Sequence, residues 1–155
     1  MPWILLVLNG SFGTRALPRL LETKWRSLKG KEVGDILLER EVRLTTKADS
    51  HKGDAANLKE RNRPWIVQDR TARLLYAEAA DCVYGAASVC EKREERVALV
   101  ERAAELDEYA GNYSKAIQRF GEAKELSRKS GFSPCIPRQE ASIKRLEALA
   151  LAAID

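Results

Sequence analysis

The chain has 155 residues, of which 45% are hydrophobic and 32% are charged. This length suits one compact domain and leaves little room for a second. A chain of this size buries enough surface to fold without a metal ion or a disulfide bond. The composition is therefore typical of a soluble globular protein with a densely charged surface.

The net charge of +4 is unevenly distributed along the chain. Residues 1–73 contain 15 Lys and Arg against 9 Asp and Glu, whereas residues 74–155 contain 12 against 14. We interpret the basic half as a candidate for contact with an anionic surface, such as RNA or a membrane. A solvated surface of mixed charge is the alternative interpretation.

The chain begins with the apolar run Trp3 to Leu8, which is far too short to span a bilayer. It lacks the basic residues that precede a secretory signal, and the absence of acids before Glu22 is a faint sign of an organelle transit segment. Two roles stay open for this run. It either belongs to the core or docks on a partner protein through Trp3, Leu5 and Leu6.

The next segment has the pattern of a basic amphipathic helix that ends at Gly30. Its apolar residues recur at steps of three and four, and they are Leu17, Leu20, Leu21, Trp25 and Leu28. We expect the cations of this region to contact phosphates on RNA or a membrane, and they are Arg15, Arg19, Lys24, Arg26 and Lys29.

Residues 32–46 fit either a helix or a short strand, and we favour the helix. Residues 45–64 are strongly polar, with Leu58 as their one large apolar residue, so we expect a linker with at most a short helix. These patterns predict an irregular N-terminal extension over residues 1–63 and a helical domain over residues 64–155.

The pattern after Pro64 is helical throughout, which predicts an all-α fold of five or six helices built from antiparallel hairpins. We expect the charged stretch 91–96 to separate two helices, with one continuous helix over 65–110 as the alternative. Gly111 is expected to end a helix in the left-handed conformation, Asn112 to cap the following helix, and Gly131 to end that helix. Pro137 should begin the last helix, whose predicted inward residues are Ile143, Leu146, Leu149, Ala150 and Ala153.

The stretch "GNYSKAIQRFGEAKEL" within this half resembles the second half of a tetratricopeptide repeat (TPR). The matching residues are Gly111, Tyr113, Ala116, Ile117, Phe120, Ala123 and Leu126. The first half of the repeat departs from the family, because Val100, Ala103-Ala104 and Asp107 stand where the family has a Trp, a Leu-Gly pair and a Tyr. The resemblance covers about 34 residues, and an ordinary bundle-like helical pair is the other interpretation.

This resemblance implies that one face of the helix before Gly111 faces a ligand. Three carboxylates lie on that face, on Glu101, Glu105 and Glu108. We therefore expect an acidic ridge that binds a basic segment of a partner, against the alternative of a solvated helix face.

Catalytic and metal-binding motifs are absent from the sequence. His51 is the one histidine and lies in the polar stretch, and the three cysteines lack the CxxC spacing of a zinc site. The loop in "VLNGSFGTRAL" has no lysine to bind phosphate. We therefore expect no cofactor, no metal, no disulfide and no small-molecule substrate, and the free thiols favour a reducing compartment, either cytoplasm or organelle matrix.

Taken with the hairpin and the two flanking segments, these features predict a non-catalytic adaptor or accessory subunit that binds other protein subunits. The rival prediction is a basic protein associated with RNA or a membrane surface in an organelle. An enzyme is a third possibility.

Overall fold

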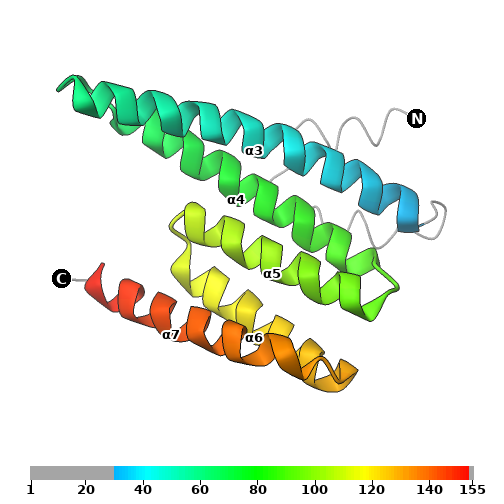
Figure 1. Ribbon diagram of the computed structural model, residues 1–155. Helices are drawn as coiled ribbons and strands as arrows, with labels where there is room; N and C mark the ends of the chain where they lie inside the picture. Colours follow the sequence, from blue (N-terminus) through cyan, green and yellow to red (C-terminus); the bar gives the residue numbers. More distant parts are fainter. Residues whose placement is uncertain (1–29, 154–155) are drawn as a thin grey trace.

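The computed structural model describes residues 30–153, and helices account for most of them. The α-helices are α3 (Gly30–Glu60), α4 (Ile66–Val89), α5 (Arg93–Tyr109), α6 (Tyr113–Ser130) and α7 (Ile136–Ala152), with a short 3-10 helix at Ser133–Cys135. Each helix packs against the next in chain order, and short loops reverse the direction between them (Figure 1). The prediction of an all-α fold built from hairpins is confirmed, and residues 30–153 contain no strand.

The prediction of a polar linker over residues 45–64 is wrong. Helix α3 continues through this stretch to Glu60 and packs along α4, and the loop between the two helices is confined to residues 61–65. Much of the expected N-terminal extension is therefore part of the helical body. The choice of helix for residues 32–46 is confirmed.

The inward face of α3 explains why the stretch looked like a linker. Its covered positions recur at alternating steps of three and four residues, as Leu37, Glu41, Leu44, Ala48, His51, Ala55 and Leu58. This spacing keeps one seam against a partner helix. Two of these positions are polar and two are alanine, so the seam carries little of the hydrophobicity by which an inward face is usually recognised.

The break between α4 and α5 lies at residues 90–92, at the start of the charged stretch 91–96, and residues 93–96 form the first turn of α5. Cys90 and Lys92 have extended backbone conformations, which interrupt the helix without a glycine or a proline. The prediction of two helices over residues 65–110 is thus confirmed.

The loops that follow also match their predictions in most respects. Gly111 (φ +80°) and Gly131 (φ +76°) are left-handed, and α7 begins at Ile136, directly before Pro137. Asn112 occupies the N-cap position of α6, but its side chain makes no capping hydrogen bond. In α7, Leu146 is fully buried, whereas Leu149 and Ala153 are exposed and were predicted wrongly as inward residues.

Small side chains form most of the core where the helices cross. Among residues 30–153, twelve of the buried residues are alanines, including Ala79, Ala80, Ala103 and Ala116 with no exposed surface. Alanine at a crossing lets two helix axes approach closely. Ala79, Ala80 and Ala103 belong to one buried cluster of α4 and α5, and Phe120 and Leu146 supply larger side chains around Ala116.

Candidate functional site

A groove of about 470 Å³ lies between α3 and α5, with α4 beneath it. We call it the α3–α5 groove. Its lining residues are Thr45, Asp49 and Lys52 of α3, Tyr76 of α4, and Arg102, Glu105, Leu106 and Tyr109 of α5. The three α3 residues come from the stretch that was expected to be a linker. The alternating spacing along α3 was the signal in the sequence that could have placed them on a helix.

Two tyrosine rings form the apolar part of this groove. Tyr76 is buried, Tyr109 is 57% exposed, and their ring centroids lie 5.5 Å apart. The ammonium of Lys52 lies over both rings, 5.2 Å from the Tyr109 centroid and 5.9 Å from that of Tyr76. Such a cation–π arrangement holds the lysine beside the aromatic surface.

Asp49 fixes the floor of the groove by accepting a hydrogen bond from the Tyr76 hydroxyl. Burial raises the pKa of Tyr76 well above its usual range, and the hydrogen bond to the Asp49 carboxylate raises it further. The Tyr76 hydroxyl therefore remains protonated at physiological pH and acts as a fixed donor, with no role as a base.

The two charged residues that α5 contributes to the groove differ in their partners. Arg102 donates to the buried Glu41 of α3, with Nη2 at 2.7 Å from Oε1. This ion pair satisfies a carboxylate that would otherwise be buried without a counter-charge. Glu105 is exposed at the edge of the groove and adds negative charge to it.

The other two carboxylates of the expected acidic ridge are covered by α7, so the prediction of one open ridge is wrong. Glu101 is 8% exposed and accepts hydrogen bonds from Arg138 at 2.5 Å and from Gln139 at 2.6 Å. Glu108 accepts a bidentate hydrogen bond from Arg145, with Nη2 at 2.8 Å from Oε2. Glu105 is exposed, whereas Glu101 is buried and Glu108 is half-buried, because side chains of α7 pair with these two carboxylates.

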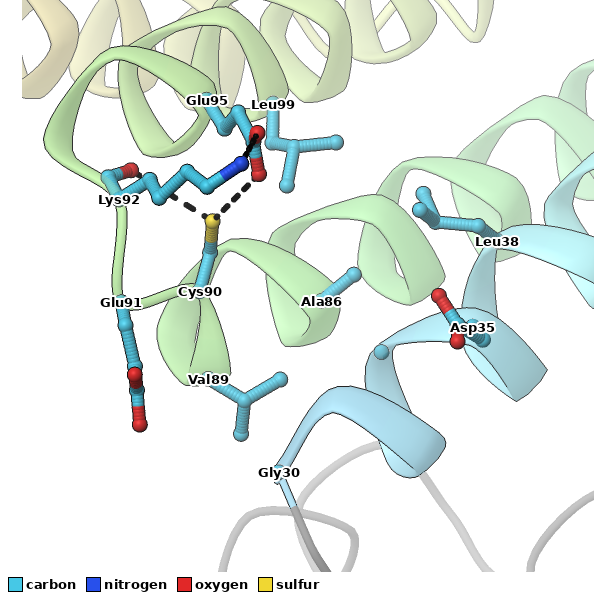
Figure 2. Close-up of a pocket in the computed structure, with 11 residues that line it drawn as sticks. Gly30, Asp35, Leu38, Ala86, Val89, Cys90, Glu91, Lys92, Glu95 and Leu99 are labelled. Carbon is cyan, nitrogen blue, oxygen red and sulfur yellow. Dashed lines mark hydrogen bonds and ion pairs between the residues drawn. The ribbon is translucent and has the colours of Figure 1, made fainter.

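A second cavity of about 490 Å³ lies where α3 begins and where α4 turns into α5 (Figure 2). We call it the end pocket. Its apolar residues are Leu38, Ala86, Val89 and Leu99, its glycines are Gly30 and Gly34, and its polar residues are Asp35, Cys90, Glu91, Lys92 and Glu95.

Cys90 lies at the rim of the end pocket, among polar groups of the α4–α5 loop. Its thiol is 3.5 Å from the carbonyl oxygen of Lys92 and 3.7 Å from Glu95 Oε2, and it can donate to either acceptor (Figure 2). Lys92 Nζ donates to Glu95 Oε1 at 2.7 Å. Cys82, on the preceding turns of α4, is buried instead, and burial raises the pKa of its thiol to about 11.

An ionic cluster joins α4, α5 and α6 outside the α3–α5 groove and the end pocket. Its members Arg119 and Asp107 are buried, whereas Asp81 and Lys115 are partly exposed. Arg119 donates to Asp107 at 2.6 Å and to Asp81 at 2.8 Å, and Lys115 donates to Asp81 at 2.6 Å. Asp107 has no exposed surface, and this burial raises the pKa of its carboxyl although Arg119 and Lys115 oppose the rise. We interpret the cluster as structural, because its charged groups are paired with one another across three helices.

Most of the other residues that were expected to bind partners or anions lie in residues 1–29, and His51 lies on helix α3. Trp3, Leu5, Leu6, the glycine loop of residues 7–17 and the cations Arg15, Arg19, Lys24, Arg26 and Lys29 lie outside the described residues. His51 is half-buried against α4, where its Nδ1 donates to Gln68 Oε1 at 2.6 Å, and so it is not a loop residue. Within residues 30–153, no three acidic, cysteine or histidine side chains are arranged to hold a metal ion.

Neither a membrane-spanning helix among the described residues nor a similarity of the chain to known proteins helps to interpret the site. Between residues 30 and 153, no helix combines the length and the apolar character that crossing a bilayer requires. The chain matches no protein-family model, no curated protein and no solved structure. The site must therefore be interpreted from its own geometry.

Proposed function

We propose that this protein is a non-catalytic interaction module, an adaptor or accessory subunit that binds a segment of another protein in the α3–α5 groove. The observation that carries the proposal is the exposed Tyr109, which is 57% accessible and whose ring packs at a tilt against that of the buried Tyr76. Tyrosine at the edge of a concave surface is a frequent anchor of protein interfaces, because it buries a large area at low entropic cost.

The groove is lined by two acids, Asp49 and Glu105, and by two cations, Lys52 and Arg102, and its exposed edge at Glu105 suits a basic partner segment. Arg102 is already paired with Glu41, and Lys52 lies over the tyrosine rings, so Glu105 supplies the negative charge at the exposed edge. The same helix binds cations elsewhere, since Arg138 and Arg145 of α7 pair with Glu101 and Glu108. A partner that places a cation at Glu105 and an apolar side chain on Tyr109 would use the same chemistry.

The resemblance to a tetratricopeptide repeat is part of this proposal. Its support is the hairpin of α5 and α6, joined at the left-handed Gly111, with Ala116, Phe120 and Ala123 buried. Proteins of that family bind peptide segments on the first helices of their repeats, and the α3–α5 groove includes Glu105 of the corresponding face of α5. The three free cysteines are the basis for proposing a reducing compartment.

Affinity capture with the intact chain tests the proposal. The groove variant combines Glu105→Lys with Tyr109→Ala, and its matched control combines Glu147→Lys with Leu151→Ala on the exposed face of α7. In each variant the two substituted residues lie four positions apart on one helix. The two changes reverse one charge and remove one exposed apolar side chain. We expect the same captured proteins from the native chain and the control, and their loss from the groove variant. Equal capture by all three chains would contradict the proposed binding surface.

A basic protein that binds RNA or a membrane surface is the second candidate, and the charge distribution favours it. Residues 1–29 contain five Lys and Arg against one acid, whereas residues 30–153 are nearly balanced, with 22 against 21. If all five cations contact phosphates of a single-stranded RNA, the logarithm of the affinity should fall against the logarithm of salt with a slope of about −3.5. Replacing Arg19, Lys24 and Arg26 by Glu should abolish such binding, whereas a complex held by the groove should persist at high salt.

A further inference from the structure

We infer that residues 17–28 of this chain occupy its own end pocket and bury Trp25 and Leu28 there. The inference is independent of the proposed function. The end pocket involves the first turns of α3, at Gly30 to Leu38, whereas the α3–α5 groove begins at Thr45.

The end pocket has the size and lining of a site for apolar side chains. Its volume of about 490 Å³ lies within the range of pockets that enclose small ligands, roughly 300–1,000 Å³. Leu38, Val89 and Leu99 are only half-buried at its walls, although Leu38 and Leu99 also pack against the core. An occupant that covers these three side chains would remove apolar surface from water.

The position of the pocket in the chain identifies the occupant. Gly30 is the first described residue and lines the pocket itself, so Leu28 is only two residues away along the chain. Such a short connection gives the preceding segment a high effective concentration at the pocket. Another molecule would need a high affinity to compete with it.

The sequence of the preceding segment fits an apolar site. Leu17, Leu20, Leu21, Trp25 and Leu28 form one stripe at helical spacing. A helix of about 12 residues is marginal by itself in water and depends on packing of its apolar face. Trp25 and Leu28 are the stripe residues nearest to Gly30, and we therefore place them in the pocket.

The charges of residues 17–29 and those of the end pocket are complementary. Residues 17–29 contain the cations Arg19, Lys24, Arg26 and Lys29 against one acid, Glu22. The lining of the end pocket contains three carboxylates, on Asp35, Glu91 and Glu95, against the single ammonium of Lys92. Exposed ion pairs contribute little stability, so these charges orient the segment and the apolar contacts hold it.

Cys90 provides a reporter inside the site, because it lines the end pocket and is half-buried. The experiment measures the rate at which a maleimide labels each cysteine of the full chain, with mass spectrometry to separate the labelled peptides. Cys135 is also half-buried, ends the 3-10 helix before α7, and serves as the internal control. We expect Trp25→Ala with Leu28→Ala to accelerate labelling of Cys90 by about tenfold and to leave Cys135 unchanged.

Trp3→Ala with Leu6→Ala is the matched variant, since it removes the same pair of residue types from the other apolar segment of residues 1–29. It should leave the labelling of Cys90 unchanged. Unchanged labelling of Cys90 in both variants, or acceleration by the Trp3 and Leu6 changes alone, would overturn the inference. Protection of Cys90 that disappears on dilution would assign the site to a second copy of the chain and would also overturn it.

A cross-linking measurement keeps the test decisive if the first variant does not fold. Leu28→Cys should form an intramolecular link to Cys90 with a short bismaleimide, and the link should be independent of protein concentration. Leu6→Cys is the control and should link poorly. If the Leu28→Cys chain links to Cys90 no better than the Leu6→Cys chain does, the proposed contact of Leu28 with the end pocket is contradicted.

Discussion

Arg119 of α6 donates from Nη1 to Asp107 Oδ2 of α5 at 2.6 Å, and both side chains are buried. The same guanidinium donates from Nη2 to Asp81 of α4 at 2.8 Å and lies 4.5 Å from the centre of the Tyr84 ring. One side chain thus connects three consecutive helices. Buried ion pairs cost desolvation and require accurate geometry, so this pair favours one packing arrangement of the hairpin over others.

Removal of one partner of this pair should be strongly destabilising. Arg119→Leu leaves Asp107 buried without its main counter-charge, and we expect a loss of about 3–5 kcal/mol in the free energy of unfolding. Denaturation in urea measures the loss. The double variant Arg119→Leu with Asp107→Leu should lose less than the single one. Arg128→Leu is the control on the same helix, because Arg128 pairs with Glu125 at the surface, and it should cost about 0–1 kcal/mol.

The stability of the protein should also depend on pH through Asp107. Burial raises the pKa of this carboxyl above 3.8, so the folded state binds its proton more tightly than the unfolded state. The stabilisation from the protonated form is fully present below pH 3.8 and is lost as the pH rises through the raised pKa. Relative to Asp107→Asn, the native chain should therefore lose free energy of unfolding as the pH increases above 3.8. A difference between the two chains that does not change with pH would contradict the raised pKa.

Ala116 should not tolerate a larger side chain. It has no exposed surface and packs against Ala104, Phe120 and Leu146. Ala116→Leu should cost about 1–3 kcal/mol through overpacking, which would lower the urea midpoint. Gln118→Leu places the same side chain at an exposed position of α6 and should leave the midpoint nearly unchanged. Equal midpoints for the two variants would show that the crossing has room for the leucine.

Cys82 should be the least reactive of the three thiols. Its side chain is 8% exposed, and burial raises its pKa from 9.0 to about 11, so little thiolate is present at neutral pH. Cys135 is half-buried at the end of the 3-10 helix before α7 and should react first in a maleimide time course followed by mass spectrometry. Labelling of Cys82 at the rate of Cys135 without unfolding would contradict the burial.

The boundaries of the helices after α3 could be predicted from local chemistry. Gly111 and Gly131 adopt the left-handed conformation that glycine favours, and a proline in the first turn marks the start of α7. The charged stretch 91–96 separated α4 from α5 because it interrupts the apolar stripe. These signals depend on a few neighbouring residues, so they can be recognised without knowledge of the packing.

The full length of helix α3 was harder to predict than the helix over residues 32–46, because its inward seam includes Glu41 and His51. Glu41 is buried only because Arg102 donates to it from α5, and His51 is covered where it meets Gln68 of α4. Both partners lie far from these residues in sequence. A polar inward position thus looks like a surface position until its partner is known.

The sequence by itself determined the all-α class, the hairpin at Gly111 and the burial of Ala116 and Phe120, since these follow from backbone preferences and from helical spacing. Tertiary structure alone decided which carboxylates of α5 face solvent. Glu101, Glu105 and Glu108 look equivalent along the helix, yet α7 covers Glu101 and pairs with Glu108 while Glu105 opens into the α3–α5 groove. Helical spacing assigns residues to a face, but the helix that packs on that face comes from a distant part of the chain, and its contacts determine which charges are neutralised.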